Sequence, residues 1–165
     1  MIRYYEKEDI EQIAKLIDED WKIAYKGMVD EKYLESLNYK EREKRIENKY
    51  QKEKAIVYEE GGVIKGFCRF GENRDEEKDL AEIYALYVKN DDIRLGIGGM
   101  LVNRAMEILK SRGYNEVILW CLKENRNGRN FYEKIGGKLY NERKFKIGDK
   151  YYDEVSYKYN LDRRN

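Results

Sequence analysis

The sequence predicts an α/β fold, built as one domain over residues 1–165, in which the strands of a sheet are flanked by helices. Seven runs rich in β-branched and aromatic residues indicate strands, and apolar residues with helical spacing separate several of them. A chain of this length can bury about 70% of the surface of its unfolded form in a single core. The expected strands span residues 2–5, 55–58, 63–70, 82–88, 116–122, 138–146 and 151–159.

The first third of the chain is predicted to be mainly helical. Ile10, Ile13 and Ile17 recur with helical spacing and form the apolar face of a first helix. Gly27 is expected to end this helix, because glycine readily adopts the left-handed conformation that follows many last turns. A second helix is expected over residues 30–37. The charged segment 38–54 is either an exposed helix or a mobile segment.

Turn residues join the predicted strands. Gly61 and Gly62 stand between two strand-like runs and predict a tight hairpin. A polar turn over residues 73–79 precedes the strand that ends at Val88. Gly148 is expected to join the last two strands into a closing hairpin, which follows a short helix over about 128–135.

A glycine-rich stretch follows the central predicted strand. Gly96, Gly98 and Gly99 lie directly before an amphipathic helix. Because glycine has no Cβ atom, the backbone there can approach a ligand closely. A helix N-terminus offers about four unpaired N–H groups and roughly half a positive charge. The stretch therefore predicts a site for an anionic, phosphorylated ligand.

Two common phosphate-binding motifs do not fit this stretch. The loop of NTPases needs lysine and a hydroxyl residue after its glycines, whereas Gly98 is followed by Gly99 and Met100. The dinucleotide fingerprint needs a third glycine where Leu101 stands. Without its flanking residues, the stretch could equally be a glycine-rich helix start that binds nothing.

The flanking motifs indicate a family. Tyr87 and Val88 precede the glycines, and Asn125 and the run Phe131 to Gly136 follow them in register. Together these motifs resemble the GCN5-related N-acetyltransferase (GNAT) superfamily. Its coenzyme loop reads Gln/Arg-x-x-Gly-x-Gly/Ala and its later signature Asn-x-x-Ala-x-x-Phe-Tyr-x-x-x-Gly. The resemblance covers nearly the whole chain. It implies a mixed, mostly antiparallel central sheet of about seven strands flanked by helices.

Three positions depart from the family pattern. Ile93 stands where the family has Gln or Arg, Gly128 where it usually has Ala, and Gly137 where Phe is common. Arg94, next to Ile93, is available for the polar contact that Ile93 cannot make.

The resemblance implies acetyl-coenzyme A as cosubstrate. The backbone around Val88 would pair with the pantetheine arm as an added strand, and N–H groups from about Arg94 to Gly99 would hold the pyrophosphate. Asn125 resembles a coenzyme-contacting residue, with a helix N-cap as its alternative role. The implied coenzyme-binding residues are Tyr87, Val88, Ile93, Arg94, Leu95, Gly96, Ile97, Gly98, Gly99, Asn125, Phe131 and Tyr132.

The resemblance also implies catalytic roles. Glu82 occupies the place of a glutamate base that takes the proton of the amine, with a solvated strand residue or a water chain as the alternative. The N–H of Leu86 would stabilise the oxyanion. The Tyr132 hydroxyl would protonate or orient the departing thiolate. The acceptor site would be lined by Trp21, Tyr25 and Glu82. The alternative for Trp21 and Tyr25 is that they are residues of the hydrophobic core.

Composition narrows the chemistry further. The chain has no histidine, which excludes Ser-His-Asp and Cys-His nucleophile systems and histidine-ligated metals. No metal is expected. Cys68 and Cys121 lie in apolar runs, which indicates small core residues in a reducing compartment.

Charge and hydropathy define the expected partners. With 34 basic and 33 acidic residues, no basic field favours nucleic acid, and no apolar run approaches the roughly 20 residues that span a membrane. A soluble, cytoplasmic enzyme is expected. It would act on a small-molecule or peptide amine whose identity the sequence leaves open. The sequence also leaves open whether the protein forms a homodimer. The alternative to an enzyme is a non-catalytic acyl-coenzyme A binding sensor or partner module.

Overall fold

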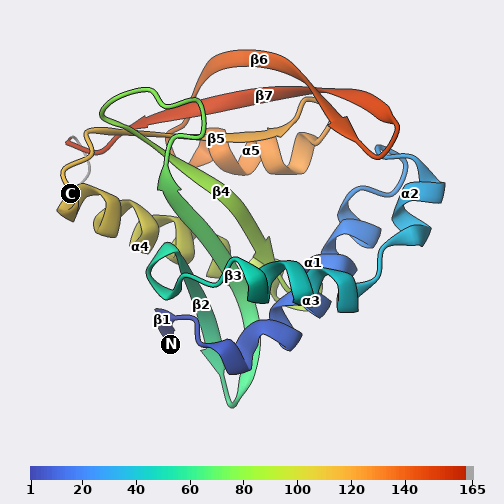
Figure 1. Cartoon of the computed structure of the whole chain (residues 1–165). Helices are drawn as coiled ribbons and strands as arrows, with labels where there is room; N and C mark the ends of the chain where they lie inside the picture. The colour runs from blue at the N-terminus through green and yellow to red at the C-terminus, as the bar shows by residue number, and fades with distance from the viewer. Residues whose placement is uncertain (163–165) are drawn as a thin grey trace. The chain divides into compact units, whose positions relative to one another are not determined.

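The computed structural model describes residues 1–162, except for the side chains of Ile93 and Arg94 (Figure 1). The strands are β1 (Ile2–Tyr4), β2 (Ala55–Glu60), β3 (Val63–Glu72), β4 (Leu80–Val88), β5 (Glu116–Leu122), β6 (Lys138–Ile147) and β7 (Lys150–Asn160). The helices are α1 (Ile10–Ala24), α2 (Glu31–Ser36), α3 (Tyr39–Asn48), α4 (Ile97–Ser111) and α5 (Arg126–Lys134). Short 3-10 helices span Lys7–Asp9, Lys52–Lys54 and Asn90–Leu95.

The strands form one seven-stranded sheet in the order β1-β2-β3-β4-β5-β7-β6. The pairs β1–β2, β2–β3, β5–β7 and β6–β7 are antiparallel, whereas β4–β5 is parallel. A parallel pair needs a long crossover connection, and here that connection is α4. The predicted fold class, a mixed and mostly antiparallel sheet with helices, is confirmed.

The chain divides into two compact units, each made of two segments. Unit 1 comprises Met1–Arg69 and Ala85–Arg104, and unit 2 comprises Phe70–Tyr84 and Ala105–Asn165. Strand β4 and helix α4 therefore each contribute residues to both units. That the whole chain acts as one acetyltransferase domain stays a prediction.

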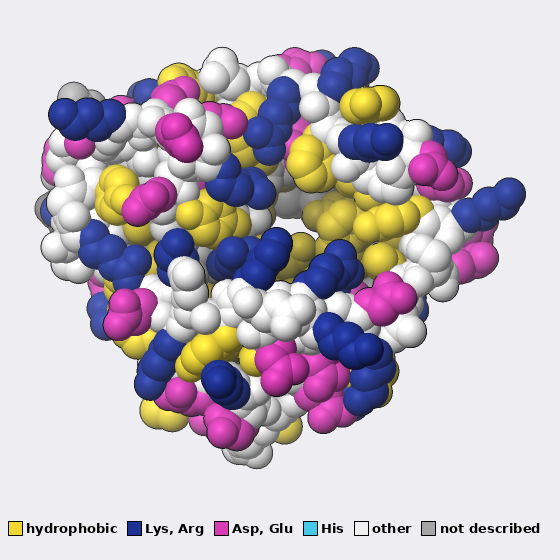
Figure 2. All heavy atoms as spheres, viewed as in Figure 1, with side chains coloured by type: hydrophobic (Ala, Val, Ile, Leu, Met, Phe, Trp, Pro, Cys, Tyr) yellow, Lys and Arg dark blue, Asp and Glu magenta, His cyan; other side chains and the backbone are white. Residues whose placement is uncertain are grey.

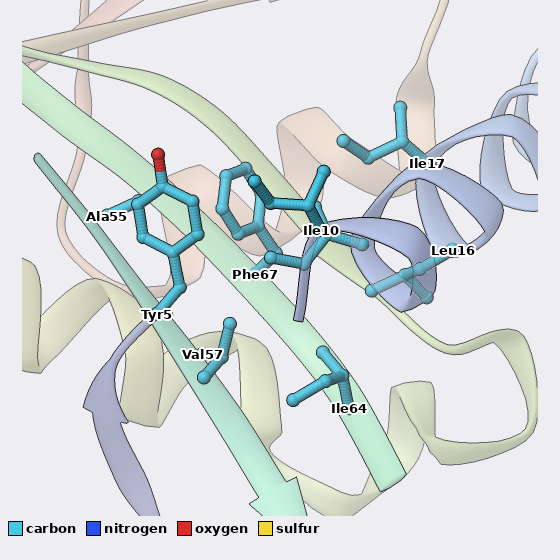
Figure 3. Close-up of a cluster of buried hydrophobic side chains, with 9 residues drawn as sticks. Tyr5, Ile10, Leu16, Ile17, Ala55, Val57, Ile64 and Phe67 are labelled. Carbon is cyan, nitrogen blue, oxygen red and sulfur yellow. The ribbon is translucent and has the colours of Figure 1, made fainter. Parts of the chain in front are cut away.

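The core of unit 1 forms where the apolar face of α1 meets β2 and β3 (Figure 3). Ile13 and Val57 are fully buried, and the ring of Phe67 packs edge-on against Tyr5 with 5.9 Å between ring centroids. The stripe predicted from the spacing of Ile10, Ile13 and Ile17 is the face that α1 buries. This packing fixes the position of α1, on which part of the candidate site depends.

Glycine positions account for the tight hairpin between β2 and β3. Gly61 and Gly62 have φ angles of 60° and 80°. Two successive positive φ angles define the turn type whose twist suits a two-residue hairpin. The predicted hairpin is therefore present at the predicted residues.

The segment 38–54, left open between helix and mobile chain, is mostly helical. Helix α3 has no buried residue, and the Asn38 side chain caps it by accepting a 2.9 Å hydrogen bond from the N–H of Lys40. An exposed helix with a polar cap explains why the segment carries so few apolar residues.

Both cysteines are buried and free, as the apolar runs around them indicate. Burial raises the pKa of the Cys68 thiol far above its usual range and that of Cys121 to about 12. Such thiols are not reactive nucleophiles at neutral pH.

Charged side chains of both signs share the face shown in Figure 2, where Lys and Arg lie among Asp and Glu. Neither positive nor negative side chains therefore cover that face alone. Within residues 1–162, no helix combines the length and the apolar character that crossing a bilayer requires.

Candidate functional site

Strand β4 runs further than its pairing with β5. The parallel ladder joins Leu80–Ile83 to Glu116–Leu119, but β4 continues to Val88. Burial changes at the same place, because the first four residues of β4 are buried and the last five are half-buried. Within the described residues, the edge of β4 from Tyr84 to Val88 takes no part in that ladder. Its N–H and C=O groups can pair with an extended ligand.

The glycine-rich stretch follows in unit 1 as a turn into α4. Gly96 is left-handed with φ +78°, and the first helical hydrogen bond runs from the Met100 N–H to the Gly96 carbonyl at 3.1 Å. By helix geometry, the N–H groups of Ile97, Gly98 and Gly99 have no acceptor inside the helix. Gly98 and Gly99 thus belong to the first turn of α4, whereas we predicted from the sequence that they lie in a loop before the helix. The first turn contains no acidic residue, which suits an anion.

Gly66 positions this turn, a role that was not predicted from the sequence. A Cβ atom at Gly66 would lie 2.7 Å from Leu101 and 3.0 Å from Ile97, both on α4. The missing side chain lets the start of α4 pack directly on β3. A glycine inside a strand, opposite an amphipathic helix, is the signal that could have revealed this contact.

The segment before the turn is anchored to β3. The N–H of Lys89 donates a 2.8 Å hydrogen bond to the Lys65 carbonyl, and Lys65 Nζ lies 3.6 Å from an Asp92 carboxylate oxygen. Lys65 also pairs, more closely, with Glu60, so it offsets only part of the negative charge of Asp92 near the proposed phosphate site. The side chains of Ile93 and Arg94, both predicted to contact coenzyme, lie outside the described residues.

Four aromatic residues of unit 1 gather at the C-terminal end of α1. The Trp21 ring lies edge-on to Tyr25 at 4.7 Å and to Tyr33 at 6.1 Å between centroids. The Trp21 indole N–H donates a 3.0 Å hydrogen bond to the Tyr87 hydroxyl on β4. Trp21 and Tyr25, predicted to line the acceptor site, are thus brought together with Tyr87, predicted to contact coenzyme. We call these four residues the ring cluster.

Asp20 is the charged residue next to the ring cluster, and the sequence reading missed it. It is half-buried, and burial raises the pKa of its carboxyl to about 6. Its charge acts on the Tyr87 hydroxyl, whose own pKa burial raises. Position 20 lies three residues after Ile17 and four after Leu16, on the apolar stripe of α1. A carboxylate on such a stripe is the signal that could have identified it.

Glu82 lies in unit 2 and is 1% exposed, so it is not a solvated strand residue. One carboxylate oxygen accepts a 3.2 Å hydrogen bond from the Arg74 N–H, and the other accepts a 2.7 Å bond from Arg74 Nε and is also held by Nη2. The Arg74 side chain is 53% exposed. The candidate base is therefore buried, with its cationic partner at the surface.

Asn125 caps a helix, which was the alternative to its predicted contact with coenzyme. Its side-chain oxygen accepts a 3.0 Å hydrogen bond from the Gly128 N–H and caps α5. A Cβ atom at Gly128 would lie 2.7 Å from the Asn125 amide nitrogen. Glycine in place of the usual alanine therefore leaves room for this cap.

Tyr132 is half-buried on α5, and its ring lies 5.4 Å from Phe131 and 6.1 Å from Tyr157 between centroids. Its backbone carbonyl accepts 2.8 and 2.9 Å hydrogen bonds from the Tyr159 hydroxyl and the Gly137 N–H. A Cβ atom at Gly137 would lie 2.6 Å from that hydroxyl. Glycine at position 137 thus makes room for the bond that fixes the end of α5.

The predicted site residues fall into two groups. Unit 1 contains the coenzyme segment from Leu86 to Gly99 together with Trp21 and Tyr25, and unit 2 contains Glu82, Asn125, Phe131 and Tyr132. Within unit 1, the Trp21–Tyr87 hydrogen bond joins the ring cluster to β4, whose edge from Ala85 to Val88 leads along the chain to the glycine turn, and these parts form one constellation. It can bind an extended ligand through backbone groups and an anion at the start of α4.

Comparison with known proteins assigns the chain to a family. The model of the acetyltransferase (GNAT) family matches residues 11–137, which include the glycine turn, Glu82 and Tyr132. The chain belongs to this family.

Individual relatives agree with that assignment. The chain is 32% identical over 125 residues to the uncharacterized N-acetyltransferase YuaI of Bacillus subtilis, covering 75% of this chain and 72% of that protein. It is 32% identical over 149 residues to the spermidine N(1)-acetyltransferase of Thermoplasma acidophilum, covering 84% and 88%. The crystal structure of the Thermoplasma acidophilum PaiA N-acetyltransferase in complex with coenzyme A superposes with a TM-score of 0.70 at 26% identity, over 93% and 96% of the two chains. The protein is an N-acetyltransferase of the GNAT type.

Proposed function

We propose that this protein transfers the acetyl group of acetyl-coenzyme A to a primary amine by direct attack. The observation that carries the proposal is the edge of β4 beyond Ile83, which leaves the β5 ladder and leads to the glycine turn of α4. Pantetheine would pair with the backbone near Val88. The pyrophosphate would bind the N–H groups of Ile97 to Gly99.

The reaction needs few protein groups. The amine nitrogen forms a bond to the thioester carbon, and the carbon–sulfur bond breaks. An alkylammonium has a pKa of about 10.4, so a base must first take its proton at neutral pH, and we propose Glu82 for this role. The Leu86 N–H would stabilise the oxyanion, and the Tyr132 hydroxyl would give its proton to the leaving thiolate.

The acceptor belongs to the class of aliphatic amines. Support comes from the spermidine N(1)-acetyltransferase of Thermoplasma acidophilum, of which the match covers 88%. Aromatic residues of the ring cluster would line the path of such an acceptor. Trp21 and Tyr25 are the candidates predicted for this contact.

The test is release of free thiol from acetyl-coenzyme A in the presence of amines. A panel of spermidine, an aminoglycoside, a peptide with a free N-terminus and lysine distinguishes the acceptor classes. We expect thiol release that depends on the amine. Tight binding of acetyl-coenzyme A without release by any amine would instead support the non-catalytic binding module.

A further inference from the structure

Asp20 is a half-buried carboxylate without a partner. Within the described residues, it forms no hydrogen bond and no ion pair. Burial penalises its negative charge and raises its pKa to about 6, so at neutral pH the folded protein holds a charge in an unfavourable place. A partly buried carboxylate without an ion pair is therefore a candidate for a binding role.

The neighbouring charges do not satisfy Asp20. Arg42 on α3 acts on the same Tyr87 hydroxyl, but its guanidinium is bound to Asp18 on α1. Even so, one buried oxygen of Asp18 has no hydrogen-bond partner. The Arg42 guanidinium is thus engaged by Asp18, and among the described residues Asp20 has no ion pair of its own.

The ring cluster supplies surfaces that suit a cation. Aromatic faces attract ammonium groups, and the attraction grows when the cation is desolvated. The hydrogen bond from Trp21 to Tyr87 holds the indole in place, and the ring of Tyr33 on α2 lies edge-on to it with 6.1 Å between centroids. A carboxylate together with preoriented rings recognises an alkylammonium: the charge pairs with Asp20, and the methylene groups lie on the rings.

We propose that Asp20 and the ring cluster bind an alkylammonium group of the acceptor, so that the enzyme selects cationic amines. This inference rests on the proposed acetyl transfer and assigns its acceptor class to named residues. It makes Asp20 a specificity-determining residue, whereas the proton acceptor proposed above is Glu82.

The test measures amine binding separately from turnover. The chain has two tryptophans, so Trp120→Phe leaves Trp21 as the only indole fluorophore. In this background we would titrate 1,5-diaminopentane at pH 7.5 and follow Trp21 emission. We expect a saturable change in emission from which an amine affinity is obtained. Asp20→Asn should lower this affinity at least tenfold, whereas Asp20→Glu, which keeps the charge, should have an affinity close to that of the parent. The matched control is Glu19→Gln, an exposed neighbouring carboxylate on α1, which should bind like the parent.

The outcomes separate the two proposals. 1-Pentanol, which has the alkyl chain without the charge, should not reproduce the emission change. Calorimetry on the protein with both tryptophans repeats the amine titration if Trp120→Phe proves unstable. Equal amine affinity in the parent and Asp20→Asn would overturn the role of Asp20. Failure of the parent to bind acetyl-coenzyme A would instead overturn the proposed function, since amine binding is read without coenzyme.

Discussion

The Trp21 indole N–H donates a 3.0 Å hydrogen bond to the Tyr87 hydroxyl, which joins α1 to the end of β4. This bond connects the segment proposed to recognise the acceptor with the strand proposed to bind coenzyme. Both residues are half-buried, so the bond is partly shielded from water. It holds the ring cluster in one arrangement.

The contribution of this bond can be measured by a double-mutant cycle. Trp21→Phe and Tyr87→Phe each remove one partner, and the double variant removes both. We expect a coupling free energy of about 0.5–1.5 kcal/mol, the usual net value of a hydrogen bond in a protein. Urea denaturation of the four proteins gives the value. Additive effects of the two substitutions would show that the bond does not stabilise the cluster.

Coenzyme binding should depend on the first turn of α4. Gly98→Val places a branched side chain among the N–H groups proposed to hold the pyrophosphate, so calorimetry should show weaker binding of acetyl-coenzyme A. Because Gly98 is buried, circular dichroism and the melting temperature of the variant are the control that it is folded. Parent affinity in a folded Gly98→Val protein would argue against this binding mode.

Tyr132→Phe tests the proposed acid. The substitution keeps the ring contacts with Phe131 and Tyr157 and removes only the hydroxyl. Turnover should fall by roughly 10²–10⁴ while coenzyme affinity stays nearly constant, because general acid catalysis contributes on that scale. Steady-state kinetics and calorimetry measure the two quantities. A turnover within about twofold of the parent would leave Tyr132 as a packing residue.

Glu82→Gln tests whether Glu82 is the base that takes the proton of the amine. Glu82→Gln keeps the shape of the side chain but cannot take a proton, so the rate should fall and the pH profile should shift to higher pH. A variant that relies on solvent uses only the neutral amine, whose fraction rises tenfold per pH unit below the pKa of the amine.

The matched variant is Arg74→Gln, which removes the ion pair but keeps the carboxylate. It should retain most of the rate. If Glu82→Gln has the parent's rate and pH profile, or if both variants lose activity equally, the pair is structural and a water chain takes the proton.

Asp20 should make stability depend on pH. The folded pKa is about 6 and the ordinary value is 3.8, so between these values the folded protein binds more protons than the unfolded chain. The free energy of unfolding therefore falls as pH rises from about 4 to 6 and is then constant for this group.

Asp20→Asn should consequently stabilise the protein at pH 7.5 and leave it unchanged at pH 4. The upper limit is about 3 kcal/mol, because a shift of about two pKa units is worth about 1.4 kcal/mol per unit. Thermal unfolding of both proteins across this pH range measures the difference. Equal stability of the two proteins at pH 7.5 would mean that the Asp20 carboxylate is well solvated.

The sequence predicted elements whose limits are set locally. Gly61 and Gly62 specify their hairpin through positive φ angles, and the helical spacing of Ile10, Ile13 and Ile17 specifies the buried face of α1. These features depend on neighbours in the chain, so a single sequence reveals them.

Features that depend on contacts between distant residues were not predictable in the same way. The role of Gly66 follows from the approach of α4, and the burial of Asp20 follows from the tertiary packing around the end of α1. The partner of Glu82 depends on how the turn over residues 73–79 folds, where Glu76 and Asp79 have positive φ angles. The roles of Glu82, Leu86 and Tyr132 stay predictions that the experiments above test.

The central claim is transfer of an acetyl group from acetyl-coenzyme A to a cationic aliphatic amine. The most direct measurement is mass spectrometry of spermidine after incubation with the protein and acetyl-coenzyme A labelled in the acetyl group. The account predicts a labelled monoacetyl product, formed in step with free coenzyme A thiol and strongly reduced in Asp20→Asn. Spermidine recovered without label, from a protein that binds acetyl-coenzyme A, would contradict it.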